Sequence, residues 1–78
     1  VLKNVKVTDK AAAQADADVQ AAVAKVAEAL GNTGRILVRE SGTEPLVRVM
    51  VEAPEHDTCQ QFVDEVVDVI CRKGYAAD

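Results

Sequence analysis

Residues 34–52 read GRILVRESGTEPLVRVMVE, in which two short apolar runs flank a polar turn. Residues 36–38 predict the centre of one strand and residues 46–51 predict the next, because branched apolar residues favour strands. In the second run, valines alternate with Arg48 and Met50, so one face is expected to be buried and the other exposed. The stretch therefore predicts an antiparallel hairpin with one buried face.

The residues before the hairpin predict a strand and then a helix. Residues 1–7 alternate in polarity and predict an edge strand, where Lys3 and Lys6 discourage unwanted pairing. Asp16 or Asp18 is the expected N-cap of an amphipathic helix that ends at Gly31. The apolar positions of this helix are Val19, Val23, Val26 and Leu30. Residues 10–15 are rich in alanine and fit either a connector or an early helical turn.

The residues after the hairpin predict a second helix. Asp57 and Gln60 have the spacing of a capping box, which would mark its start. Its apolar stripe consists of Cys59, Phe62, Val63, Val66, Val67 and Ile70. Gly74 is the expected stop, and residues 75–78 show no pattern and are expected to fray.

The elements follow the order β-α-β-β-α and predict the α+β class. We expect a two-layer sandwich in which two helices cover one face of a mostly antiparallel sheet of three or four strands. The length of 78 residues predicts a single domain over residues 1–78. The chain starts at Val1 rather than Met, which favours a piece excised from a longer protein.

Composition argues against several classes of protein. The net charge of −4 does not suit a nucleic-acid binder, which needs a basic face. No apolar run approaches the roughly 18 residues of a membrane span. Cys59 and Cys71 lie about 18 Å apart on the predicted second helix, too far for a disulfide. They are expected to be reduced thiols of a cytoplasmic protein, and the lysines of the first strand favour a monomer.

The polar turn and the strand ends beside it carry groups that suit a phosphate dianion. Arg39 and Arg48 offer planar donor forks, and Ser41 and Thr43 offer hydroxyl donors. Gly42 lets the backbone adopt a positive φ and lets its N–H approach an anion without a Cβ in the way. On spacing alone, an ordinary turn between solvated strands explains these residues equally well.

The other polar residues give weaker signals. Glu44 sits awkwardly beside a phosphate, so it is expected to structure the loop, pair with an arginine or meet a sugar hydroxyl. His56 is the only histidine and is expected to be exposed. The sequence has no metal-ligand spacing and no Ser–His–Asp arrangement. We therefore expect neither a metal site nor catalysis by this chain alone.

As a string, residues 34–52 resemble the C-terminal domain of the α-D-phosphohexomutases. The loop of that superfamily has the form R-x-S-G-T-E-P, present here at residues 39–45. The extension P-L-x-R-V-M-x-E, at residues 45–52, is similar to the bacterial phosphoglucosamine mutases. The resemblance implies that Arg39 and Arg48 are charge-assisted phosphate ligands. It also implies hydroxyl hydrogen bonds from Ser41 and Thr43, and one from the backbone N–H of Gly42.

The resemblance further implies a setting for this domain. Such a domain is the last of four around a cleft and grips the phosphate of the phosphosugar substrate, while Mg²⁺ and a phosphoserine belong to the other domains. The implied reaction interconverts glucosamine 6-phosphate and glucosamine 1-phosphate through a bisphosphorylated intermediate, which feeds UDP-N-acetylglucosamine and cell-wall synthesis. Two alternatives stay open: the same domain of a phosphoglucomutase or phosphomannomutase, and a non-catalytic regulatory module of the ferredoxin-like kind.

Overall fold

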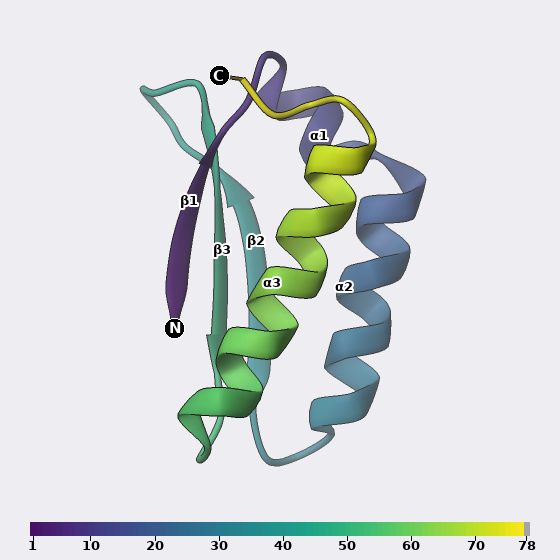
Figure 1. Ribbon diagram of the computed structural model, residues 1–78, viewed down its shortest axis with the longest axis vertical. Helices are drawn as coiled ribbons and strands as arrows, with labels where there is room; N and C mark the ends of the chain where they lie inside the picture. The colour runs from purple at the N-terminus through teal and green to yellow at the C-terminus, as the bar shows by residue number, and fades with distance from the viewer. Residues whose placement is uncertain (78) are drawn as a thin grey trace.

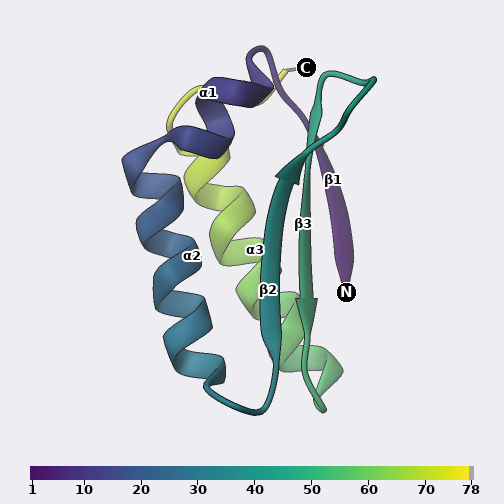
Figure 2. The same cartoon turned by 180° about the vertical axis from the view of Figure 1, so that it is seen from behind.

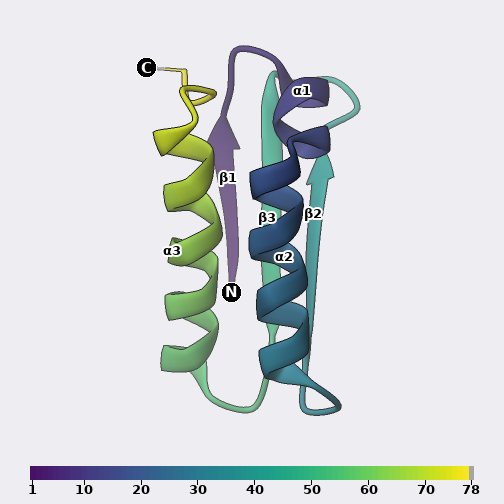
Figure 3. The same cartoon turned by 90° about the vertical axis from the view of Figure 1, so that its right-hand side faces the viewer.

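A three-stranded antiparallel sheet forms one layer of the computed structural model, which describes residues 1–77. The strand order is β1-β3-β2, so β3 is central and the two other strands are edges. The elements are β1 (Leu2–Lys6), α1 (Lys10–Ala15), α2 (Ala17–Leu30), β2 (Arg35–Glu40), β3 (Leu46–Glu52) and α3 (His56–Arg72). Helices α2 and α3 lie side by side against one face of the sheet, and the other face carries no helix (Figures 1 and 3). The predicted α+β sandwich and the edge position of the first strand are confirmed.

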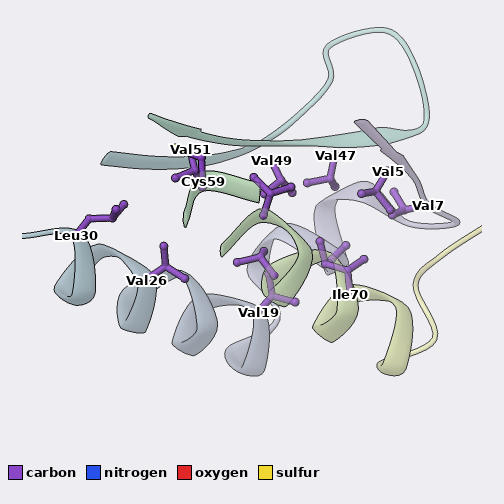
Figure 4. Close-up of a cluster of buried hydrophobic side chains, with 13 residues drawn as sticks. Val5, Val7, Val19, Val26, Leu30, Val47, Val49, Val51, Cys59 and Ile70 are labelled. Atoms are coloured by element: carbon purple, nitrogen blue, oxygen red, sulfur yellow. The ribbon is translucent and has the colours of Figure 1, made fainter. Parts of the chain in front are cut away.

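The core lies between β3 and the two long helices. Val47, Val49 and Val51 are each 0% exposed, as their alternation predicts. They face the apolar stripes of α2 and α3, whose buried members are Val19, Val26, Leu30, Cys59, Val63, Val66 and Ile70 (Figure 4). Full burial of one such side chain contributes about 1.5–3 kcal/mol. This face of β3 therefore supplies much of the stability of the sandwich.

The region between β1 and α2 holds a third helix. Residues 10–15 form α1, so the early helical turn is the correct one of the two alternatives. Asp16 then caps α2, because its Oδ1 accepts hydrogen bonds from the N–H groups of Asp18 and Val19. Helix α2 ends at Leu30 with Gly31 as its C-cap, whose φ of 55° favours glycine. The structure thus has three helices in residues 1–77, one more than predicted, and the additional helix is the short α1.

The predicted capping box of α3 is wrong. The helix begins at His56 with Glu55 as its N-cap, and no side chain caps it. Asp57 is already inside the first turn, where its carboxylate still interacts favourably with the helix dipole. His56 is exposed, as expected. Cys59 is buried and Cys71 is exposed, and both are free thiols, which confirms that they do not pair with each other.

The predicted fraying of the C-terminal tail is also wrong over residues 75–77. The Tyr75 hydroxyl donates to Asp16 Oδ2 at 2.7 Å, and the Ala77 N–H donates to the Lys6 carbonyl at 2.9 Å. The hydrogen bond from Tyr75 lowers the pKa of Asp16, and in turn raises the pKa of Tyr75. The tail therefore pairs with the chain where β1 ends, while Asp78 lies outside the described residues.

Candidate functional site

The hairpin of β2 and β3 places two arginines directly opposite each other. Arg39 pairs with Arg48 in the strand register, and both side chains are exposed on the face that carries no helix. Like charges in this position repel each other across about 5 Å between Cβ atoms. Within residues 1–77, neither guanidinium lies within 4.0 Å of a carboxylate oxygen. Farther along the same strands, Arg35 does pair with Glu52 at 2.9 Å. An anion seated between Arg39 and Arg48 would relieve their repulsion.

The turn that joins the strands is organised by Ser41. This side chain is the one buried polar side chain among the described residues, with 8% of its surface exposed. Its Oγ accepts hydrogen bonds from the N–H groups of Thr43 and Glu44, at 3.4 and 3.2 Å. Its own N–H donates to the Leu46 carbonyl at 2.9 Å, which closes the turn. The Ser41 hydroxyl therefore shapes the loop and keeps one hydrogen that it can donate.

Gly42 differs from the expectation in its backbone. Its φ is not positive, and a Cβ built on it would meet nothing within 4 Å. The turn takes its shape from the Ser41 hydrogen bonds, so no left-handed residue is required at this position. In the part of the chain that the structure describes, the Gly42 N–H has no hydrogen-bond acceptor. Gly42 as a residue is exposed, so this N–H is a candidate donor to a ligand.

The remaining polar residues of the turn are Thr43 and Glu44. Both are exposed. The backbone of Glu44 structures the turn, because its carbonyl accepts from the Leu46 N–H at 2.8 Å. Its carboxylate forms no ion pair within residues 1–77. The hairpin thus brings the two arginines, the loop hydroxyls and the Gly42 N–H to one end of the sheet, where the loop leans away from the helices (Figure 2).

Two residues of α1 also contact this region, and the sequence does not single them out. The ammonium of Lys10 donates to the Ser41 carbonyl at 2.6 Å and to the Glu44 carbonyl at 3.4 Å. Gln14 donates to the Val38 carbonyl and accepts from the Glu40 N–H at 2.9 Å. Their spacing of four residues on an alanine-rich segment was the only available signal.

Two further searches of residues 1–77 concern metals and membranes. No group of three or more His, Cys, Asp or Glu side chains is placed to hold a metal ion in that range. None of the helices described there has the length and apolar content needed to cross a bilayer.

Known relatives share almost the whole of this chain. The chain is 68% identical to the phosphoglucosamine mutase of Lachnospira eligens over 97% of its own length and 17% of that relative. It is 56% identical to the phosphoglucosamine mutase of Shouchella clausii, over 88% of the chain and 16% of the relative. The corresponding enzyme of Mycobacterium marinum is 54% identical over 95% of the chain and 17% of the relative. The chain thus spans about a sixth of the length of these curated relatives.

The family comparison covers the fold and the loop together. Residues 2–69, from β1 to the last turns of α3, match the family described as phosphoglucomutase/phosphomannomutase, C-terminal domain. This range contains the Arg39–Arg48 hairpin, the whole of α2 and α3 as far as residue 69. On this match, the chain belongs to the phosphoglucomutase/phosphomannomutase C-terminal domain family.

Proposed function

We propose that this chain is the domain of a phosphoglucosamine mutase that binds the phosphate group of the substrate. The observation that supports this proposal most strongly is the direct pairing of Arg39 with Arg48 in the strand register. Neither cation is neutralised by a carboxylate within residues 1–77, and the turn beside them contains the Gly42 N–H, which has no acceptor there. Each guanidinium can form charge-assisted hydrogen bonds to phosphate oxygens, and such bonds are about twice as strong as neutral ones. The relatives named above carry that enzyme name, which supports the choice of substrate class.

The proposed role divides the work between the loop and the strands. Arg39 and Arg48 neutralise a phosphate dianion, while Gly42 donates its N–H and the hydroxyls of Ser41 and Thr43 donate from the turn. These groups read a phosphate and not a face of the sugar. The loop can therefore take either phosphate of a bisphosphorylated intermediate that turns over between glucosamine 6-phosphate and glucosamine 1-phosphate. In this proposal, the carboxylate of Glu44, which forms no ion pair within residues 1–77, meets a sugar hydroxyl.

The rest of the enzyme supplies the chemistry in this proposal. The phosphoserine and the Mg²⁺ belong to other domains, and the isolated chain is inactive. The working protein is cytoplasmic and makes a precursor of UDP-N-acetylglucosamine for cell-wall synthesis. The chain alone is a monomer, because the tail bonds to the end of β1 and Gln14 occupies backbone groups of β2. Both sheet edges are thereby partly closed to a second copy.

An NMR titration with glucosamine 6-phosphate tests the binding role. The amides of Ser41, Gly42 and Thr43 should shift with a dissociation constant on the order of millimolar, since one loop supplies few contacts. Inorganic phosphate should shift the same amides, and glucosamine without phosphate should not. Shifts confined to α2 and α3, or none at high ligand concentration, would contradict the proposal.

A kinetic experiment on a full-length enzyme that carries this domain tests the same role. Arg39→Ala should raise KM and lower kcat/KM while the fold stays intact. Arg72→Ala is the matched control, because Arg72 is exposed on α3 and pairs with Asp68. Wild-type kinetics in the Arg39 variant would refute the role as phosphate ligand.

The family match also covers a second candidate, the same domain in a phosphoglucomutase or phosphomannomutase. Competing glucose, mannose and glucosamine phosphates in one assay of the full-length enzyme would decide between them. A ferredoxin-like regulatory module predicts a dimer instead, and sedimentation of the chain would detect it.

A further inference from the structure

Helix α1 holds the loop from the side opposite the arginines. Lys10 is half-buried, and its ammonium contacts the Ser41 and Glu44 carbonyls, one at each end of the turn. Gln14 fixes α1 itself, because it pairs with both a carbonyl and an N–H of β2. Figure 3 shows α1 next to the end of β2 where the turn begins.

The contact with the Ser41 carbonyl determines where the next N–H points. The peptide between Ser41 and Gly42 is trans, so its carbonyl and its N–H point in opposite directions. Because Lys10 binds this carbonyl from the helix side, the Gly42 N–H is directed away from the helices. The loop leans that same way, toward the face that carries Arg39 and Arg48 (Figure 1).

The location of Lys10 is unfavourable for the helix. Lys10 is the first residue of α1, and no acidic residue lies in that first turn. A cation is disfavoured at a helix N-terminus, where the dipole is positive. Asp9 caps the helix through a hydrogen bond to the Ala12 N–H, which keeps α1 in place. Lys10 thus contributes to the loop rather than to the helix it begins.

We propose that Lys10 is a positioning residue for the anion site, because it holds the loop carbonyls on the helix side and leaves the Gly42 N–H facing the ligand. This role rests on the proposed function of the hairpin loop as a phosphate-binding site. Lys10 itself does not touch the phosphate, since its ammonium is bound to the loop carbonyls from behind. Its effect on affinity passes through the order and direction of the loop amides.

The test compares lysine variants of the 78-residue chain in two NMR measurements. The first is the order of the Gly42 and Thr43 amides without ligand, from the ¹H–¹⁵N heteronuclear NOE. The second is the dissociation constant of inorganic phosphate. Lys10→Met removes the donor and keeps most of the apolar stem. Lys10→Arg restores a donor, and Lys25→Met removes the same charge from an exposed site on α2.

Lys10→Met should lower the NOE of both amides and weaken phosphate binding roughly three- to tenfold, as expected for the loss of one hydrogen bond of average strength. Lys10→Arg should recover most of both effects, and Lys25→Met should match the wild type in both. Unchanged loop order in Lys10→Met overturns the proposal; if phosphate binding is weaker all the same, Lys10 acts as a distant charge. The order measurement needs no ligand. If the wild type fails to bind phosphate, the proposed phosphate-binding function is refuted. The effect of Lys10 on loop order is still tested by the first measurement.

Discussion

The facing pair Arg39–Arg48 predicts that stability and phosphate binding respond in opposite directions to one substitution. Arg39→Gln keeps a long polar side chain but removes one of the two repelling charges. Without phosphate, the variant should be more stable than the wild type. With phosphate, the order should reverse, because only the wild type has both arginines for the anion.

The size of each effect follows from the geometry. A directly opposed pair on a sheet face changes stability by about 0.2–1 kcal/mol. For a domain of this length, about 0.5 kcal/mol raises Tm by roughly 2–4 °C. Phosphate at ten times its Kd stabilises the wild type by about 1.4 kcal/mol, which exceeds that gain. In 1 M salt the Debye length falls to about 3 Å, so the gain of the variant should largely disappear.

Thermal unfolding at low salt, at high salt and with added phosphate measures all three effects. Arg35→Gln is the matched control on the same strand and face, because Arg35 is paired with Glu52. The Arg35→Gln substitution removes the exposed ion pair with Glu52, so Tm should stay the same or fall slightly. The reasoning is refuted if Arg39→Gln is less stable than the wild type at low salt, or if phosphate stabilises both proteins equally.

Three other predictions concern Gly42, Gly34 and the C-terminal tail. Gly42→Ala should change the free energy of unfolding by less than about 1 kcal/mol, since its Cβ meets nothing, yet weaken phosphate binding. Gly34→Ala should cost roughly 1–3 kcal/mol in urea unfolding, because its Cβ would lie 2.1 Å from the Glu52 carbonyl oxygen; equal stability of the two variants would contradict this. Tyr75→Phe should return the pKa of Asp16 toward 3.8. The wild type has the stabilisation from this lowered pKa above pH 3.8 and loses it as the pH falls through the folded-state pKa, so the free energy of unfolding should be less pH-dependent in the variant below pH 3.8.

The fold was predictable where its signal is local. The alternation in β3 and the stripes of α2 and α3 are read from neighbouring residues, and the structure buries those positions. The order of the tail was not predictable, because it depends on Tyr75 meeting Asp16 across 59 positions of sequence. The start of α3 was misread for a different reason. The spacing of Asp57 and Gln60 suggested a capping box that starts at Asp57. In the structure Glu55, directly after Pro54, has an extended backbone and is the N-cap of the helix.

The candidate site divides in the same way. The pairing of Arg39 with Arg48 follows from the register of the hairpin, and the position of the turn in the sequence indicates that register. The contacts of Lys10 and Gln14 do not follow, because they depend on where a short helix docks. Gly42 was expected to be needed for its backbone freedom, but the Ser41 hydroxyl shapes the turn without a positive φ.

The two faces of β3 explain how a small domain keeps such a site. On the inner face, Val47, Val49 and Val51 are fully buried, and each contributes about 1.5–3 kcal/mol. On the outer face, the opposition of Arg39 and Arg48 costs about 0.2–1 kcal/mol, well below the contribution of one valine. Since period-two alternation separates the faces, substitutions that tune anion binding on the outer face leave the core contacts intact. Changes at Arg48 should therefore alter phosphate affinity far more than the free energy of unfolding, whereas changes at Val49 should do the reverse.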